Sequence, residues 1–375
     1  MAFTYLHFYT EFLKSVKKEY GIEIHLKEDT KGGLFPNVKE EDCEICFNPK
    51  LLVLVLLYNI YLQDKGVTTE SVSLYTLYNM YMSVDEYDRA KVQLDKLENE
   101  LALIGRNTVR GKGILESVGE AANLQMLFIL LHETYHILLS RLPGIKEQFL
   151  EGARQRVEDL KAMLPSSKNE RQMQEEMYRL IPAEVPLEER EKMKKEMASK
   201  LSTKWREICD YDLYLNKENG MLEELACDLQ AWNLLVHQLG ASGCPSEHIL
   251  QANAWIFMSL NIMDYDKFLG TLYKDDCAKK EVVNPRTAVL RHSFLRSYIL
   301  TYYDKNRHHT FSEFKQIAES MEDNGRAGLI ANMSHHAEDI AALKKAPFRI
   351  PDFAVRDELE AKEHEIRDKV LRLVL

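Results

Sequence analysis

The stretch LQMLFILLHETYHILL at residues 124–139 is strongly apolar, yet it carries His132, Glu133 and His136 in its middle. A run of this length and composition predicts a buried helix. Burying a polar group without a partner costs roughly 2–7 kcal/mol, so the three side chains need partners inside the fold. The same groups would be expensive in lipid, and the apolar segment 51–63 is shorter than the roughly 20 residues of a membrane span. Both segments therefore indicate core helices of a soluble protein.

The spacing of the two histidines favours a metal ion as their partner. Positions i and i+4 lie one turn apart on the same face of an α-helix, so His132 and His136 can both reach one Zn²⁺. Glu133 follows the first histidine directly and can act as general base toward a water on the metal. The alternative is a helix whose histidines make ordinary buried hydrogen bonds.

A second apolar segment, GMLEELACDLQAWNLLV at residues 220–236, carries acids near its start. Glu224 and Asp228 are spaced i, i+4 and share a helix face. A zinc site with two histidines needs a third protein ligand, which Glu224 would supply, while Asp228 would accept the outer N–H of a ligand histidine. Glu223 is the rival ligand, but position 227 is a cysteine and gives it no carboxylate partner. A solvent-facing acidic edge is the structural alternative for the pair.

The two motifs together, His132-Glu-Thr-Tyr-His136 and Glu224-Leu-Ala-Cys-Asp228, resemble the gluzincin pattern of HExxH followed by ExxxD. The run LACDLQA is also similar to that of ImmA/IrrE-type and Lit-like phage-exclusion peptidases, which cut specific cellular proteins. The resemblance implies a mainly α (α+β) fold with a zincin-like metallopeptidase core and a small sheet packed on the metal helix. It further implies His132, His136 and Glu224 as zinc ligands, Glu133 as the base, and Asp228 behind a ligand histidine.

The function expected from this resemblance is that of a cytosolic zinc metallopeptidase, an endopeptidase acting on a protein or peptide substrate. Zn²⁺ is the expected cofactor, since a His₂Glu set favours it over manganese or iron. The alternative is a catalytically silent, metallopeptidase-like protein that acts as a protein-binding or regulatory module. An intact Glu133 argues against that alternative. A zinc-dependent hydrolase of non-peptide amides would use the same ligands and stays open.

The segment VVNPRTAVLRHSFLRSY, residues 282–298, is the best place to look for a group that stabilises the oxyanion of such a reaction. Arg291 and His292 follow Pro285 on an expected helix, and either could stabilise developing negative charge. Compact gluzincins sometimes carry a proline followed by a downstream arginine, which this segment resembles. We therefore name Arg291 and His292 as catalytic candidates, against the simpler interpretation of an exposed Arg-His pair.

The rest of the chain is expected to be mostly helical. Apolar residues recur at helical spacing in the segments 4–20, 50–63, 69–82, 84–104, 115–140, 221–300 and 361–375. Gly21 closes the first helix and Pro143 the fifth, and the last helix is amphipathic, so it should pack on the body or on a second subunit.

A small antiparallel hairpin is expected near the N-terminus. Residues 21–28 and 42–49 alternate apolar and polar side chains on either side of the turn-rich DTKGGLFPN. If the second of these strands is an edge, an extended substrate could pair with its backbone, as gluzincin substrates do.

Composition divides the chain into three parts. These are residues 1–144 with the sheet and the HExxH helix, residues 145–208, and residues 209–375 with the third ligand and the C-terminal helices. The middle part is dense in Glu, Lys and Arg, which is typical of a solvated helical insertion with paired surface charges. The alternative for this insertion is a docking arm for a protein partner.

Charge and cysteine content argue against other classes of protein. A net charge of −10 argues against a general nucleic-acid binder, which usually has a basic surface. Six cysteines in 375 residues are too sparse for a disulfide scaffold, and the N-terminus lacks the pattern of a signal peptide, so we expect a cytoplasmic protein. Cys43 and Cys46 form a lone CxxC, but strand alternation would put their thiols on opposite faces, which favours a structural role over a zinc clip or redox pair.

Overall fold

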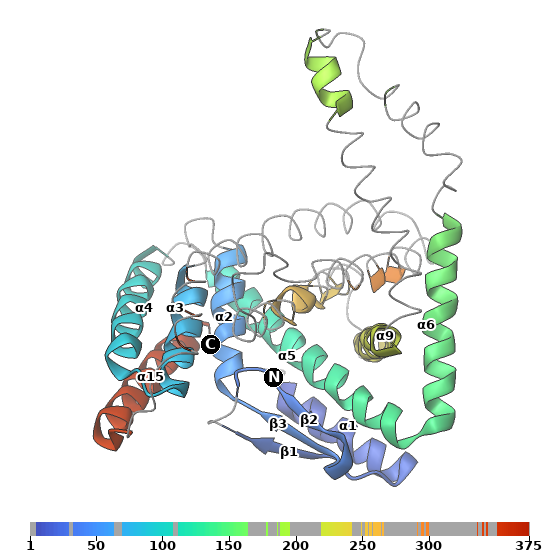
Figure 1. The fold of residues 1–375 in the computed structure, drawn as a ribbon, viewed down its shortest axis with the longest axis horizontal. Helices are drawn as coiled ribbons and strands as arrows, with labels where there is room; N and C mark the ends of the chain where they lie inside the picture. The colour runs from blue at the N-terminus through green and yellow to red at the C-terminus, as the bar shows by residue number, and fades with distance from the viewer. Residues whose placement is uncertain are drawn as a thin grey trace.

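The computed structural model describes six long segments of the chain and several shorter ones. The long segments are residues 5–29, 33–63, 70–107, 112–163, 219–241 and 351–374. The shorter pieces are residues 178, 186, 188–195, 249, 252–253, 255–256, 258–263, 265, 291, 294–295, 298–299, 336, 340 and 343. Within these residues helices dominate, and one small three-stranded sheet lies near the N-terminus (Figure 1).

Helix α5, Lys112–Arg141, is the central element of the fold. Its 30 residues make it about 45 Å long, and the apolar run Met126–Leu131 in its middle is at most 1% exposed at every position. A helix that is apolar on all sides must be covered on all sides, and α1, α2, α6, α9 and α15 all contact it. The predicted core helix at residues 115–140 is confirmed.

Helix α1, Tyr5–Tyr20, packs against α5 and buries Tyr5, Tyr9 and Val16. It ends at Gly21, whose φ of +71° is the left-handed conformation that glycine adopts without strain. The Gly21 N–H donates to the Lys17 carbonyl at 3.0 Å and so satisfies one of the last carbonyls of the helix. The predicted closure at Gly21 is confirmed.

The sheet has the order β1-β3-β2 and is mixed, not antiparallel. Strand β1, His25–Glu28, runs parallel to the central strand β3, Glu44–Phe47, and strand β2, Asn37–Lys39, runs antiparallel to it. Ile45 and Phe47 point into the core, whereas Glu44 and Cys46 lie on the other face.

The predicted antiparallel hairpin between residues 21–28 and 42–49 is therefore wrong. Strand β2 begins at Asn37, the last residue of the turn-rich segment, and the short helix η1, Glu40–Asp42, joins β2 directly to β3. A loop this short closes more easily than the longer connection from β1, so the antiparallel pair forms between β2 and β3. Strand β3 is consequently central rather than an edge, and β2 is the edge strand that contacts α5.

Cys43 and Cys46 are free thiols. Cys43 has a left-handed φ of 49° at the end of η1, before the strand begins. The Cys46 Sγ donates to Glu44 Oε1 at 3.1 Å, and Lys39 and Lys27 pair with the same carboxylate. The thiols are thus not bonded to one another, and a structural role for these cysteines stays a prediction.

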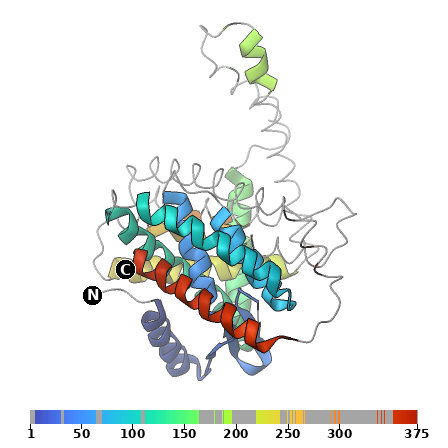
Figure 2. The same cartoon turned by 90° about the vertical axis from the view of Figure 1, so that its left-hand side faces the viewer.

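Four further helices pack against one another. They are α2, Lys50–Gln63, α3, Glu70–Ser83, α4, Tyr87–Asn107, and α15, Phe353–Val374. Helix α15 lies along α4, as Figure 2 shows for the red and cyan ribbons, and also contacts α2 and α5. Tyr75 Oη donates to Glu363 Oε1 at 2.7 Å, and Tyr78 Oη donates to the Leu359 carbonyl at 3.3 Å. The C-terminal helix packs on the body, the first of the two predicted partners.

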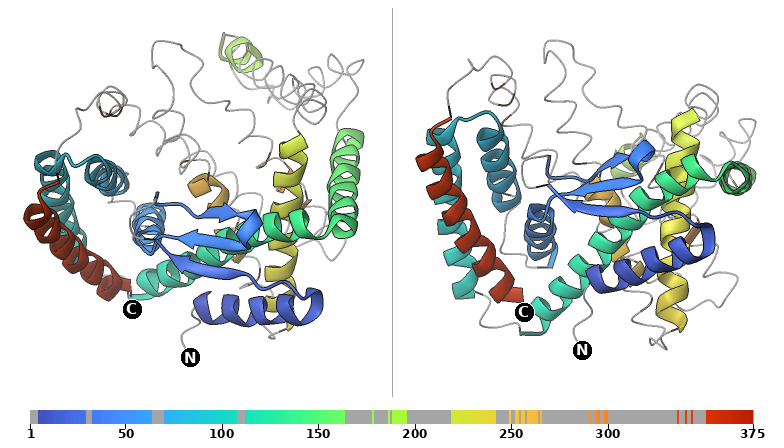
Figure 3. Two further views of the ribbon diagram at one scale, coloured as in Figure 1. Left: turned by 60° about the horizontal axis from the view of Figure 1, so that its bottom comes forward. Right: turned by 90° about the horizontal axis from the view of Figure 1, so that it is seen from below.

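Two helices complete the surroundings of α5. Helix α9, Asn219–Ala241, crosses α5 (Figure 3), and helix α6, Pro143–Met163, turns away from its end and contacts α9. Proline suits the first position of α6 because the missing N–H would be unbonded there in any case. The first part of the charged region at 145–208 is thus a helix that lies against the body. Across the described residues, no helix is both long and apolar enough to cross a membrane.

Candidate metal centre

Three predicted ligand side chains converge where α5 and α9 cross. The Nε2 atoms of His132 and His136 lie 3.1 Å apart. Glu224 Oε2 lies 3.5 Å from His132 Nε2, and Glu224 Oε1 lies 3.9 Å from His136 Nε2. One donor atom from each of the three residues can be chosen so that all lie within 4.8 Å of one another. The i, i+4 spacing on α5 places the two histidines on one face of that helix, and the crossing helix α9 supplies the glutamate.

This arrangement fits a tetrahedral zinc ion. Zn–N and Zn–O bonds of roughly 2.0–2.1 Å imply that two ligands of a tetrahedral ion lie about 3.3 Å apart. The three observed separations of 3.1, 3.5 and 3.9 Å bracket that value. Two imidazole Nε2 atoms facing each other at 3.1 Å also need a shared proton or a cation between them. The donor set therefore forms a possible metal-binding site.

Asp228 lies behind His132, as predicted. Its Oδ1 is 2.9 Å from His132 Nδ1, and the side chains of both residues are at most 1% exposed. Arg291 completes this buried group, because its Nε and Nη2 donate to the two Asp228 oxygens at 2.7 and 2.6 Å. Burial alone would raise the pKa of Asp228, but the charges of Arg291 and His132 outweigh it and lower the pKa to about 2.

The protonation of His132 follows from the same contacts. Burial alone would lower its pKa, but the Asp228 carboxylate and the hydrogen bonds with Asp228 and Glu224 outweigh it and raise the pKa to about 9. The Asp228 carboxylate thus faces Nδ1 of the imidazole, and Nε2 faces Glu224 and His136.

Arg291 is not part of an exposed Arg-His pair, because its side chain is 1% exposed. Its Nη1 lies 3.1 Å from Glu224 Oε2, so the guanidinium contacts Glu224, the third candidate ligand, as well as Asp228. A sequence signal for this pairing existed in principle: a carboxylate inside an apolar helix calls for a buried cation. The proposed catalytic role of Arg291 stays a prediction, and His292 and Pro285 lie outside the described residues.

Glu223, the rival ligand, lies on the other side of His136. Its Oε1 is 3.5 Å from His136 Nδ1, and its Oε2 accepts from Lys146 Nζ at 2.7 Å. The interaction with His136 first, and then that with Lys146, lowers the pKa of Glu223 to about 2 against the opposing effect of burial. Sequence reasoning weighed Glu223 as a ligand and missed both this position and Lys146.

Glu133 lies on α5 directly after the first ligand and is partly buried. Burial raises the pKa of its carboxyl group, while the neighbouring His132 and His136 act in the opposite direction. A carboxylate whose pKa moves toward neutrality is better suited to accept and release a proton at neutral pH.

The helical turn of α5 that carries His132, Glu133 and His136 is also held by a contact with α1. Tyr9 Oη lies 2.6 Å from Thr134 Oγ1, which itself donates to the Leu130 carbonyl at 2.8 Å. The ring of Tyr135 packs between Phe12 and Phe149, so the prediction that Tyr135 is a core residue is confirmed.

Comparison of the chain with protein-family models, with curated proteins and with solved structures finds no match. The metal-site assignment therefore rests on the chain's own donor atoms. The gluzincin resemblance is carried by the two motifs, and a zincin-like core stays a prediction.

Proposed function

We propose that this protein is a cytoplasmic zinc metallopeptidase of the gluzincin type that hydrolyses peptide bonds of a protein substrate. The observation that carries the proposal is the convergence of His132, His136 and Glu224 on one point, with Glu133 next to the first ligand.

The residues of the site divide the chemistry among them. A zinc ion held by His132, His136 and Glu224 would supply Lewis-acid activation of water and of the scissile carbonyl. Glu133 takes a proton from the attacking water as the new C–O bond forms, and it passes that proton to the leaving nitrogen as the C–N bond breaks. Asp228 Oδ1 lies 2.9 Å from His132 Nδ1, where it would hold a proton and leave Nε2 of that residue to bind the metal.

An extended substrate would pair with strand β2 in this proposal. The sequence suggested the strand at residues 42–49, but β3 is paired on both sides, whereas β2 is an edge of the described sheet and contacts the metal helix α5. Backbone pairing with an edge strand binds a peptide in extended form independently of most of its side chains.

The proposal is tested by elemental analysis of the purified protein. We expect about one zinc per chain in the wild type and a loss of zinc in the His132→Ala, Glu224→Ala double variant. A Glu133→Gln variant should keep its zinc and lose cleavage of a peptide library made from a cell extract. A wild-type protein that takes up no zinc when it is offered the metal at neutral pH would remove the peptidase proposal.

One observation favours the second candidate, a catalytically silent protein-binding module. The ligand Glu224 already has a cation in Arg291 Nη1 at 3.1 Å, and His132 has its counter-charge in Asp228. This group of charges would be balanced without a metal ion. If the wild type binds no zinc and the His132→Ala, Glu224→Ala variant is strongly destabilised, the group is structural, which favours the second candidate over the first.

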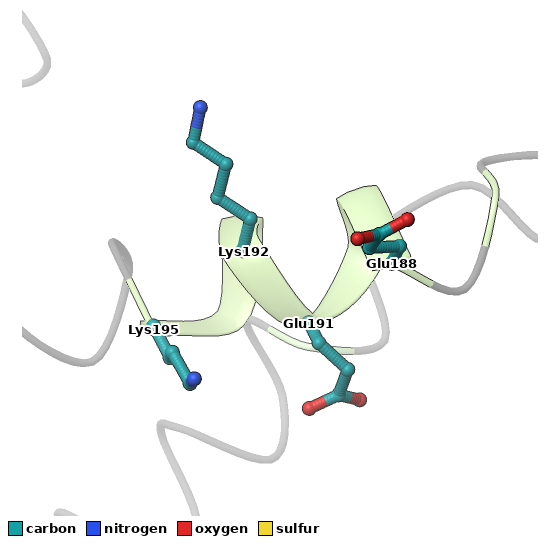
Figure 4. A pocket seen from close by; sticks show the side chains of 4 residues that line it. All are labelled: Glu188, Glu191, Lys192 and Lys195. Carbon is teal, nitrogen blue, oxygen red and sulfur yellow. The ribbon is translucent and has the colours of Figure 1, made fainter.

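The region 145–208 stays a proposed docking site for a partner protein. A short helix at 188–195 carries Glu188, Glu191, Lys192 and Lys195 around a shallow hollow, and Figure 4 shows these side chains pointing in different directions. Lys194 pairs with Glu191 at 2.7 Å along the same helix. Paired charges of this kind are typical of a solvated helix face, so the hollow itself is not proposed as a site.

A further inference from the structure

We propose that Lys146, in the first turn of α6, is a positioning residue of the metal centre that acts on His136 through Glu223. The inference rests on the proposed metal site and adds to it a residue outside both sequence motifs. It also assigns a role to Glu223 that differs from that of a metal ligand.

The contacts form a continuous path of three side chains. Lys146 Nζ donates to Glu223 Oε2 at 2.7 Å, and Glu223 Oε1 faces His136 Nδ1 at 3.5 Å. That second distance is at the long limit of a hydrogen bond, so a shift of about 0.5 Å would bring it to an ordinary N–H···O length. The other ring nitrogen of His136 faces His132 and Glu224. Glu223 therefore lies where it can fix the orientation and the tautomer of the second ligand.

The division of the two Glu223 oxygens explains why Glu224 and not Glu223 faces the metal position. Neighbouring residues on a helix point roughly 100° apart, so the two glutamates of α9 approach His136 from different sides. Lys146 holds one oxygen of Glu223 away from the donor cluster, and His136 Nδ1 faces the other. Charge and position together make Glu223 an outer partner of the site.

The place of Lys146 in the fold is fixed by the corner between α5 and α6. Helix α5 ends at Arg141 and α6 begins at Pro143, and the Lys146 N–H donates to the Leu142 carbonyl at 2.9 Å. Helix α6 also packs on α9, the helix that carries Glu223. The start of the charged region is thus tied to the ligand His136, and the metal affinity should depend on that tie.

The test is the zinc affinity of the full chain, measured by competition with a chromophoric chelator. Glu223→Ala should weaken binding about 10–100-fold, the range found for outer partners of metal ligands. Lys146→Met, which is one contact further from the ligand, should weaken it less, by about 3–10-fold. A Lys146→Arg variant keeps the positive charge and should therefore retain most of the wild-type zinc affinity. A Glu223→Ala, Lys146→Met double variant should bind zinc no more weakly than Glu223→Ala alone, because Lys146 acts through Glu223.

Lys194→Met is the matched control. Lys194 also pairs with a glutamate at 2.7 Å, and its side chain is 32% exposed, against 36% for Lys146. The thermal midpoint of the metal-free protein and the chemical shift of the His136 Nδ1 proton are measured beside the affinity. A purely structural role would lower the midpoint in Lys146→Met and leave the affinity of the folded fraction unchanged, which would overturn the inference.

The outcomes separate this inference from the proposed function. If the wild type binds zinc and Glu224→Gln abolishes the binding, the metal site stands. An affinity of Lys146→Met equal to that of Lys194→Met would then overturn the role of Lys146 alone. A tighter affinity in Lys146→Met would mean that freed Glu223 becomes a ligand, which also overturns the inference. A wild type without zinc removes both proposals.

Discussion

Each of the two histidines of the candidate metal site is backed by a carboxylate and then by a cation, but the two sets of side chains differ in their exposure to solvent. His132 is backed by Asp228 and Arg291, all at most 1% exposed, whereas His136 is backed by Glu223 and Lys146, which are 18% and 36% exposed. A buried carboxylate that loses its cation cannot be solvated by water instead. At a partly exposed ion pair, water can take the place of the lost partner. We call Asp228 and Arg291 the inner chain, and Glu223 and Lys146 the outer chain. The comparison indicates that the inner chain contributes to the stability of the fold, while the outer chain affects mainly the orientation of His136.

The largest expected effect comes from removing the cation of the inner chain. Arg291→Met leaves the Asp228 carboxylate buried without its guanidinium, and breaking a buried pair in this way costs about 3–5 kcal/mol of the free energy of unfolding. Urea unfolding of the metal-free protein measures it. Lys146→Met is the comparison and should cost at most about 1 kcal/mol. Equal losses in the two variants would contradict the distinction between the chains.

Replacing both members of the inner pair should undo part of that loss. In an Asp228→Leu, Arg291→Met double variant no unpaired charge of the pair remains, so we expect it to recover about 2 kcal/mol relative to Arg291→Met alone. Zinc affinity should not recover, because His132 loses the acceptor for its Nδ1 proton. A double variant that regained stability and zinc affinity together would show that Asp228 does not orient His132.

A smaller effect is expected on the side of α1. Tyr9→Phe removes the hydrogen bond to Thr134 and leaves the ion pairs intact, so the free energy of unfolding should fall by about 1 kcal/mol. The Tyr135 packing gives the site a second support, and zinc affinity should change less than in Glu223→Ala. Thermal unfolding and chelator competition together measure the two quantities. A Tyr9→Phe variant with wild-type stability and weakened zinc binding would reverse this assignment.

The smallest expected effect is that of salt. Screening acts on exposed charges over a Debye length of about 3 Å at 1 M salt and about 30 Å at 0.01 M. The difference in zinc affinity between wild type and Lys146→Met should therefore shrink by about two- to three-fold over that range. The unfolding deficit of Arg291→Met should stay nearly constant over the same range. A salt-independent Lys146 effect would place that pair among the buried ones.

What the sequence predicted well depended on local spacing. The helical periodicity of α5 and the i, i+4 positions of His132 and His136 follow from residues close together in the chain, and the same holds for Glu224 and Asp228 on α9. A helix converts such spacing directly into a shared face. The convergence of the two helices on one point was inferred from the chemistry of a three-ligand site and agrees with the structure.

What the sequence did not predict depended on contacts between distant residues or on loop closure. Arg291 and Asp228 are 63 positions apart and Lys146 and Glu223 are 77 apart, and no local pattern marks which cation meets which acid. The sheet order failed for another reason, since Asn37–Lys39 is too short a strand to show alternation. The structure shows that this segment is strand β2 because η1, Glu40–Asp42, brings it into antiparallel register with β3.

The bond between Tyr75 and Glu363 has a consequence for the time order of folding during synthesis. The two residues are separated by 288 positions, and ribosomes add about 5–20 residues per second. The surface of α3 that α15 will cover is therefore made roughly 15–60 s before its partner helix exists. During that interval the rings of Tyr75 and Tyr78 have no α15 to cover them. A nascent chain of this protein is thus expected to need chaperone protection through most of translation, until α15 has been made.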